Sequence, residues 1–228
     1  MAAAVSLAEV VRGRRVVLVR HGNTAKADVD ADRELTEIGR AQCDKFREAW
    51  SGNLVGITTV LASYVTRTMQ TATLLAQALG VEVTPVEDLY FVRPWRTAEM
   101  KAADKDCGYA PIGVYIERHP GAHDPARQAM GEAVARAAAA APPGDLLIVG
   151  HAGYLSFVAL EVAEAMAAGM PAQDGWLDAA KKVILEANVG EVCGFEIGPS
   201  GARYLPNPES TDFAAAKSND AFVTGAAP

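Results

Sequence analysis

Residues 15–24 of the chain, Arg15-Val16-Val17-Leu18-Val19-Arg20-His21-Gly22-Asn23-Thr24, join a short apolar run directly to a polar cluster. A brief apolar run rich in β-branched residues is typical of a strand that is buried on both faces. In open α/β sheets, ligands bind beyond the carboxyl ends of the strands. The polar residues that follow Val19 are therefore candidates for a ligand site.

A second stretch repeats this arrangement. Leu146-Leu147-Ile148-Val149 is another apolar run, and it ends at Gly150-His151-Ala152-Gly153. One histidine at the end of a strand is more often a structural hydrogen-bonding residue than a catalytic one. Two such ends in one sheet converge on the same crevice, and this coincidence favours a functional site.

Strands and helices alternate along the rest of the chain. Further strands are expected near residues 57–62, 81–86, 191–197 and 202–205. Helices are expected from Thr36, a good N-cap, to about residue 50, and over residues 66–79, 125–141 and 154–168. This alternation predicts a three-layer α/β/α sandwich with a mostly parallel central sheet.

The segment from Tyr90 to Asp124 differs from its surroundings. It contains several prolines and aromatic residues and has no long periodic run. Long irregular segments in compact domains are often functional loops, so we interpret residues 90–124 as an insertion or lid on a single domain of residues 1–228. The polar tail from about Pro206 is expected to be frayed.

Composition limits the classes of partner. The 228 residues carry a net charge of −7, so neither nucleic acid nor an anionic membrane surface is the expected partner. An anionic substrate would need a local basic pocket. Three widely spaced cysteines and no amino-terminal basic region ahead of an apolar core indicate neither a disulfide framework nor a signal peptide, and favour a cytoplasmic location. The sequence does not set the oligomeric state.

Arg67 is the next candidate. It falls in the first turn of the predicted 66–79 helix, a position that the helix dipole does not favour for a cation. A solvated arginine is one interpretation. The other is an anion held there by the guanidinium group together with free backbone N–H groups.

These stretches together resemble a known family. Val19-Arg20-His21-Gly22-Asn23-Thr24, Leu35-Thr36 with Gly39-Arg40-Ala41-Gln42, Arg67 with Gln70-Thr71-Ala72, and Val149-Gly150-His151 occur in the order of the histidine phosphatase superfamily, which has the phosphoglycerate-mutase-like fold. The resemblance covers about residues 15–169, and the carboxyl-terminal hairpin is also similar. Arg-His-Gly alone is a weak signal, but its order with Arg67 and His151 is specific.

The resemblance implies a chemistry. Neutral His21 attacks phosphorus in line and forms a phosphohistidine, which water then hydrolyses. Arg20, Arg67 and a protonated His151 stabilise the charge on the phosphoryl oxygens. Asn23 adds a neutral hydrogen bond, and Gly22 and Thr24 complete the substrate-binding loop. No metal and no cofactor are expected, because cationic side chains take the place of a metal ion.

The general acid is the part of the family pattern that this sequence lacks. Many members place a glutamate two residues beyond the leucine that follows the third strand, and here that position is Phe91. Another branch uses an aspartate directly after the second histidine, where this chain has Ala152. Glu87 and Asp88 are possible donors, although out of register, and Glu99 is a further candidate.

The short segment between the first two motifs and the pair Leu89-Tyr90 are similar to the short phosphohistidine phosphatases of the superfamily. A missing acid is tolerable when the leaving group is good. We therefore predict a phosphoric monoester hydrolase that acts on a small phosphorylated metabolite or on phosphohistidine. The alternatives are a phosphoglycerate mutase and a catalytically weak protein that binds a phosphorylated ligand.

Two other groups of residues are weaker candidates. His119 and His123 flank Pro120-Gly121, which prevents a helical metal-binding pair, so a metal is not expected there. The run Arg93-Pro94-Trp95-Arg96 either extends the phosphate pocket or merely covers the insertion.

Overall fold

The computed structural model describes residues 5–90, 96–171 and 173–210. Phe91 and Arg93 lie outside these ranges, as does most of the tail predicted to fray. The beginning of that tail is held in place: the Trp50 indole N–H donates to the Pro206 carbonyl at 2.9 Å, and Asn207 is buried.

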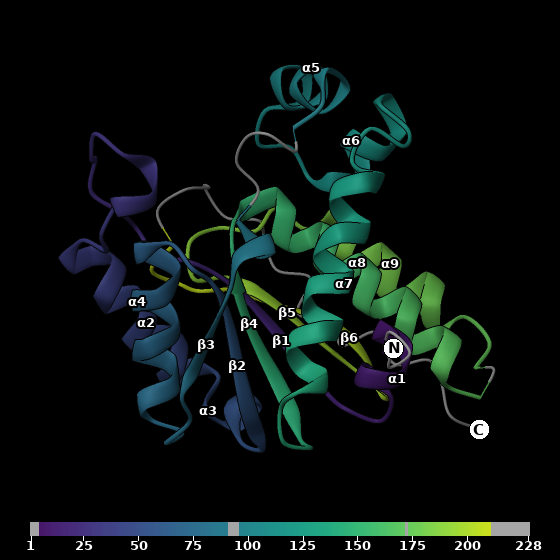
Figure 1. Ribbon diagram of the computed structural model, residues 1–228, viewed down its shortest axis with the longest axis horizontal. Coiled ribbons are helices and arrows are strands. Elements are labelled where there is room, and N and C mark those ends of the chain that lie inside the picture. Colours follow the sequence, from purple (N-terminus) through teal and green to yellow (C-terminus); the bar gives the residue numbers. More distant parts are fainter. Residues whose placement is uncertain (1–4, 91–95, 172, 211–228) are drawn as a thin grey trace.

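A single sheet forms the centre of the fold (Figure 1). Within the described residues it has six strands in the order β3-β2-β4-β1-β5-β6. β1, β2, β3 and β4 pair in parallel, whereas β5 pairs antiparallel with both β1 and β6. The predicted mostly parallel sheet is confirmed, with an antiparallel hairpin at one edge. The strands are β1 (Val16–Arg20), β2 (Ile57–Ser63), β3 (Val83–Val86), β4 (Asp145–Gly150), β5 (Gly194–Gly198) and β6 (Gly201–Leu205).

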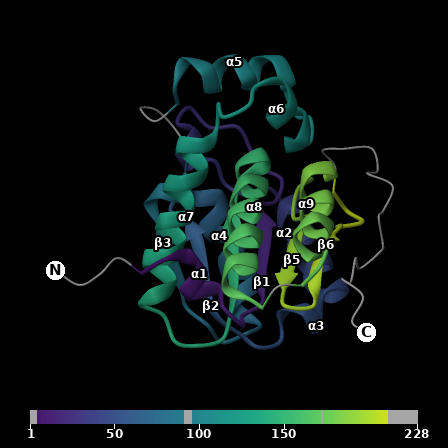
Figure 2. The same ribbon diagram turned by 90° about the vertical axis from the view of Figure 1, so that its right-hand side faces the viewer.

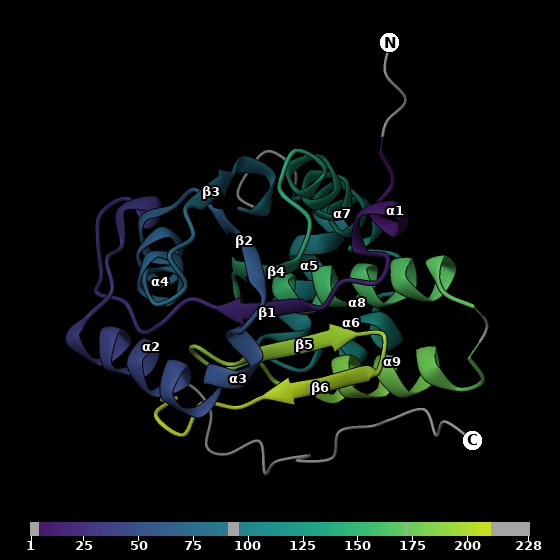
Figure 3. The same ribbon diagram turned by 90° about the horizontal axis from the view of Figure 1, so that it is seen from below.

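Helices cover both faces of this sheet (Figure 3). Alternate residues of β1 show the division: Val16 and Leu18 belong to one core cluster, and Val17 and Val19 to the other. The first cluster packs beneath α1 (Leu7–Val11), α7 (Asp124–Ala139), α8 (Ala152–Gly169) and α9 (Trp176–Glu186). The second packs beneath α2 (Glu37–Ala49), α3 (Ser51–Leu54) and α4 (Thr66–Gln77). The three-layer α/β/α sandwich is thereby confirmed.

The start of α2 is built as the sequence predicts. The Thr36 hydroxyl accepts a hydrogen bond from the Gly39 backbone N–H at 3.1 Å, which satisfies a donor that the first helical turn leaves open. The buried face of the helix is centred on its middle turns. Phe46 and Cys43 are buried, while Ile38 is 54% exposed.

The segment expected to be irregular between residues 90 and 124 contains two helices, α5 (Ala98–Cys107) and α6 (Ile112–Arg118). They extend beyond the ends of α7 and α8 (Figure 2). The signals for α5 are a cap, with the Thr97 hydroxyl accepting from the Met100 N–H, and buried positions at Met100, Ala103 and Cys107. This helical spacing was masked by the prolines that flank it.

α8 is long and apolar enough, by length and composition alone, to cross a membrane, but half of it is buried within the fold. Its contacts with α1, α7 and α9 are those of a core helix. Two short 3₁₀ turns complete the described elements: η1 (Asp30–Asp32) precedes α2, and η2 (Glu87–Leu89) follows β3.

Candidate active site

The two strand-end histidines lie side by side. β1 and β4 are adjacent parallel strands in which Arg20 is the partner of Gly150, so His21 and His151 follow at the same edge of the sheet. Their ring centroids are 5.3 Å apart. The structure thus brings together the two histidines that the sequence placed at separate strand ends.

A hydrogen bond to the next residue fixes the tautomer of His21. Its Nδ1 lies 2.8 Å from the Gly22 carbonyl oxygen, and a carbonyl can only accept, so Nδ1 carries the proton and donates. This leaves the lone pair of the neutral ring on Nε2. Burial, and next the charge of Arg20, lower the pKa of His21 to about 3, so the ring is neutral at physiological pH.

Arg67 projects from the first turn of α4 and is 5% exposed. Its guanidinium group holds an anion in this structure: Nη2 donates to Asp30 Oδ2 at 2.9 Å, and Nη1 donates to the Asp30 carbonyl at 2.6 Å. Nη2 also lies 3.5 Å from His151 Nδ1. Of the two interpretations of Arg67, the structure shows a buried arginine that binds a carboxylate.

Tyr90 completes the surroundings of Arg67. Its hydroxyl donates to Asp30 Oδ2 at 2.5 Å, and the Arg67 guanidinium carbon lies 5.5 Å from the centre of its ring. Its ring is also 5.1 Å from that of His151. Desolvation raises the pKa of Asp30, but the hydrogen bond from Tyr90 and the charge of Arg67 outweigh it, so the pKa of Asp30 is lowered and the side chain is ionised.

Arg20 is the last residue of β1 and is 7% exposed. Its Nη1 donates to the Val189 carbonyl at 3.0 Å, which fixes one side of the guanidinium group. The charge of Arg20 contributes to the lowered pKa of both His21 and His151. Arg20 therefore stands close enough to both rings to influence their protonation.

A chain of hydroxyl groups orients His151. Its Nε2 lies 2.7 Å from Ser63 Oγ, which lies 2.7 Å from Thr68 Oγ1, and the Thr68 hydroxyl donates to the Ser63 carbonyl. Because Thr68 uses its proton on a carbonyl, Ser63 donates to Thr68 and accepts from His151 Nε2–H. Nδ1 of His151 is then the acceptor that faces Arg67.

The protonated His151 implied by the resemblance is not the form that this site favours. Desolvation, and then the neighbouring His21, Arg67 and Arg20, hold the pKa of His151 well below its ordinary value. Burial and the two cationic guanidinium groups disfavour a second positive charge, so His151 is neutral while no phosphate lies between them. A bound phosphate dianion would reverse this local balance, because an opposite charge favours the protonated ring.

Steric crowding explains why position 22, in Arg20-His21-Gly22, is a glycine. A Cβ on Gly22 would lie 2.8 Å from the Gly39 carbonyl oxygen, and one on Gly39 would lie 2.2 Å from the Asn23 carbonyl oxygen. The loop after β1 and the first turn of α2 therefore touch backbone to backbone. This close approach links the first two motifs.

Asn23 and Thr24, predicted to bind substrate, form contacts within the protein. The Asn23 amide donates to Glu191 Oε1 at 2.9 Å, and its Oδ1 accepts from the Thr36 hydroxyl at 2.8 Å. Thr24 Oγ1 accepts from Arg33 at 2.5 Å. These bonds hold the loop in place, and a direct contact with substrate remains a prediction for both residues.

The proposed proton donors lie on η2 and α5. Glu87 is exposed, and Asp88 pairs with Arg136 of α7 at 2.8 Å. Glu99 is exposed in the first turn of α5. A role as general acid remains a prediction for each of them.

Asp30 and Ser63 were not singled out from the sequence, and Tyr90 was noted only as part of the pair Leu89-Tyr90, without a role in the site. Ser63 is the last residue of β2, so the argument that selected the two histidines at strand ends applies equally to it. Asp30 reaches Arg67 from η1, and Tyr90 reaches it from the position directly after η2. Only the folded chain places these two segments next to α4.

A cavity of about 360 Å³ adjoins His151. His151 and the first two turns of α8 form one wall, and residues between Arg96 and His123 supply the rest. Part of the segment 90–124 therefore lines the cavity next to His151. Of the run 93–96, Arg96 lies in this cavity and pairs with Asp104.

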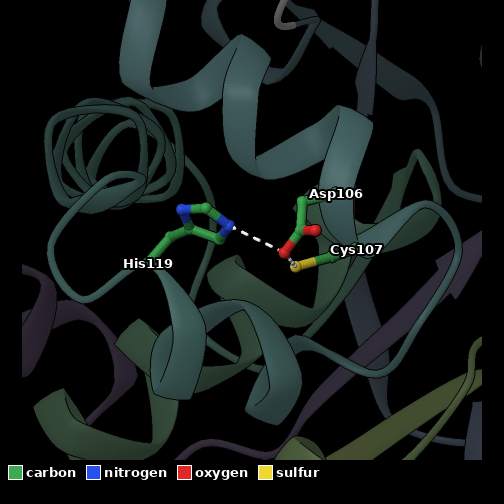
Figure 4. A group of neighbouring side chains, drawn as sticks. All are labelled: Asp106, Cys107 and His119. Atoms are coloured by element: carbon green, nitrogen blue, oxygen red, sulfur yellow. Dashed lines mark hydrogen bonds and ion pairs between the residues drawn. The ribbon is translucent and has the colours of Figure 1, made fainter.

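A separate group on the insertion consists of Asp106, Cys107 and His119 (Figure 4), whose potential ligand atoms all lie within 4.8 Å of one another. Asp106 Oδ2 lies 3.0 Å from His119 Nε2 and 3.6 Å from Arg118 Nη1. Desolvation raises the pKa of the Cys107 thiol, which disfavours the thiolate that binds metals. These contacts join the end of α5 to the end of α6.

The sequence model of the histidine phosphatase superfamily (branch 1) matches residues 16–186. No curated protein sequence matches the chain. The match spans more than half of the chain, so this protein belongs to the histidine phosphatase superfamily.

The fold is also that of a solved structure, and two further solved structures are similar. YhfR from Bacillus stearothermophilus is 18% identical with a TM-score of 0.52, and the alignment covers 87% of this chain and 98% of that one. The alpha-ribazole phosphatase from Shigella flexneri is 20% identical with a TM-score of 0.49, and 88% of this chain and 100% of that one are covered. The SixA protein of Agrobacterium tumefaciens is 18% identical with a TM-score of 0.47, covering 85% and 96%.

Proposed function

We propose that this protein is a phosphoric monoester hydrolase that acts through a phosphohistidine on His21. One observation carries the proposal: Nδ1 of His21 is committed to the Gly22 carbonyl, so the lone pair lies on Nε2 of a neutral ring beside His151. A neutral imidazole with a fixed tautomer is an effective nucleophile toward phosphorus.

The mechanism follows from the groups around that nitrogen. The Nε2 lone pair of His21 forms a bond to phosphorus while the bond from phosphorus to the leaving-group oxygen breaks. Arg20 and Arg67 stabilise the negative charge on the phosphoryl oxygens, which is the largest contribution in phosphoryl transfer. A water molecule then attacks phospho-His21, and inorganic phosphate leaves.

Asp30 supports the assignment of Arg67 to phosphate binding. The Asp30 carboxylate already binds the Arg67 guanidinium group through Oδ2. The side chain of Asp30 is 52% exposed, whereas that of Arg67 is 6% exposed. A buried arginine that binds an oxyanion is suited to bind a phosphate. The substrate dianion would compete with Asp30 for this group.

The absence of an assigned acid bears on the substrate. A leaving group of low basicity needs little protonation in the transition state, so phosphohistidine and activated phosphoesters would be cleaved most readily; we propose a small phosphorylated metabolite or phosphohistidine as the substrate. The three cysteines are buried and not joined in disulfides. A cytoplasmic location remains part of the proposal.

Trapping of the intermediate tests this function. The wild type is mixed with 4-nitrophenyl phosphate, quenched, and assayed for protein-bound phosphate that is labile in acid and stable in base. We expect such phosphate on the wild type and on a His119→Ala control, and none on His21→Ala. Turnover by His21→Ala at the wild-type rate would overturn the assignment.

The same preparation separates the alternatives. Interconversion of 2- and 3-phosphoglycerate after priming with 2,3-bisphosphoglycerate would indicate a mutase. Binding of phosphoesters without release of phosphate would indicate a protein that senses a phosphorylated ligand. We expect neither result.

A further inference from the structure

The cavity beside His151 has a largely aromatic lining. Aromatic side chains form most of its wall, and Tyr115, His123 and Phe157 among them are less than 10% exposed. His123 stacks on Phe157 with 4.8 Å between ring centroids and 12° between ring planes. Tyr115 packs edge-on against both of these rings. Such a wall offers flat apolar faces to a ligand.

The charged groups of this wall neutralise one another. Arg96 forms an ion pair with Asp104, and Asp104 Oδ1 also lies 3.1 Å from His123 Nε2. Desolvation, and next the charge of Arg96, lower the pKa of His123. The pair Arg96–Asp104 therefore has no net charge, and a ligand that entered with a second anionic group would find Arg96 already bound to a carboxylate.

The position of the cavity connects it to the reaction. His151 lines it and also stands 5.3 Å from the His21 ring. A substrate whose phosphoryl group is bound at His21 and Arg67 would direct its leaving group past His151 into this space. The volume of about 360 Å³ lies at the lower end of small-molecule sites, which suits a group of one or two rings and not a polypeptide.

We infer that the cavity selects phosphomonoesters whose leaving group is an uncharged, ring-bearing alcohol, with Asp104 as the residue that excludes a second anion. The inference rests on the proposed function and goes beyond it, because it names the chemical class of the leaving group. Aromatic faces contribute the affinity. The Arg96–Asp104 pair contributes the discrimination against carboxylate- or phosphate-bearing alcohols such as phosphoglycerate.

The first experiment compares benzyl phosphate with propyl phosphate, which are esters of alcohols with similar basicity. We expect kcat/KM for benzyl phosphate to be higher by about tenfold or more, as for a group bound in a fitted apolar pocket. Tyr109→Ala, in the cavity wall, should reduce this preference. Ile116→Ala is the control, because Ile116 is exposed on the same insertion and does not line the cavity. Equal values for the two esters in the wild type would overturn the inference while leaving the phosphatase activity established.

The second experiment tests the role of Asp104. The wild type should prefer benzyl phosphate to 4-carboxybenzyl phosphate by about tenfold or more. In Asp104→Asn the charge of Arg96 is no longer neutralised, so this ratio should fall toward one or invert. A ratio that stays unchanged would contradict the assignment. Because the ratio is measured within one variant, a general loss of stability does not imitate the result.

Binding separates this inference from the proposed function. Calorimetric titration of His21→Ala measures the affinity for benzyl, propyl and 4-carboxybenzyl phosphate without turnover. Preferential binding of benzyl phosphate would support the inference even if no ester is hydrolysed by the wild type. Equal affinity for all three would refute it whatever the activity.

Discussion

At the scale of single residues, the site is a set of groups held in one protonation state by their neighbours. His21 and His151 are both neutral because burial and adjacent cations lower their pKa values. The sequence was sufficient to select these two histidines and Arg67, since each stands at the end of a strand or the start of a helix. It was not sufficient to select Asp30, because only the fold shows that its carboxylate occupies Arg67.

Replacement of Asp30 tests whether its carboxylate competes with the substrate phosphate for the Arg67 guanidinium group. In Asp30→Asn the negative charge on Arg67 is removed while a side-chain carbonyl remains. We expect KM for 4-nitrophenyl phosphate to fall about fivefold with little change in kcat, since a half-exposed ion pair is worth about 1 kcal/mol. Steady-state kinetics at low ionic strength would measure this effect.

Asp28→Asn provides the matched control, because Asp28 is an exposed aspartate of the same loop and its loss changes the net charge equally. Its KM should change less. A rise of KM in Asp30→Asn would show instead that the carboxylate positions Arg67 for substrate.

Ser63 offers a second prediction at this scale. Ser63→Ala removes the acceptor of the His151 Nε2–H hydrogen bond and leaves a donor without its partner, at a cost of about 1–3 kcal/mol. We expect kcat/KM to fall about tenfold because the ring is no longer held against Arg67. Thr59→Ala, on the same strand but far from the carboxyl edge, should retain the wild-type value. Full activity of Ser63→Ala would exclude a role in orienting His151.

At the scale of elements, the sequence predicted what local patterns determine. The apolar runs of β1 and β4, the cap of α2 and the helices α4, α7 and α8 are each specified within a few neighbouring residues. The order of the strands in the sheet depends on contacts between distant residues, so local patterns do not determine it. α5 and α6 were missed because the prolines around them resemble those of a loop, and the helical spacing within each is short.

The contact between the β1 loop and α2 gives a prediction for these elements. Gly39→Ala would place a Cβ 2.2 Å from the Asn23 carbonyl oxygen, so backbone has to move. Overpacking of this kind costs about 1–3 kcal/mol, and chemical denaturation should show a corresponding loss of stability together with reduced activity. Gly52→Ala is the control, because a Cβ there meets nothing within 4 Å. Equal stability of the two variants would refute the steric account.

At the scale of the whole molecule, the neutral histidines make stability depend on pH. The folded-state pKa of His21 is depressed to about 3, and an unfolded histidine has a pKa of about 6.5. Below about pH 6.5 the unfolded chain therefore binds more protons than the folded one, and unfolding becomes more favourable as the pH falls. The contribution of His21 is fully present above pH 6.5 and is lost progressively toward pH 3. His151, whose pKa is lowered by the same causes, acts in the same direction.

The expected change in the free energy of unfolding is large enough to measure. One histidine of this kind costs about 1.4 kcal/mol per pH unit, so His21 alone should remove about 2 kcal/mol of the free energy of unfolding between pH 6.5 and pH 5. Urea titrations at pH 7 and pH 5 give this difference for the wild type. His21→Asn should lose about 2 kcal/mol less than the wild type over the same interval, whereas Thr84→Ala, exposed on β3, should lose as much. An identical loss in His21→Asn and the wild type would show that the ring is not held neutral by the fold, and would remove the basis for assigning it as the nucleophile.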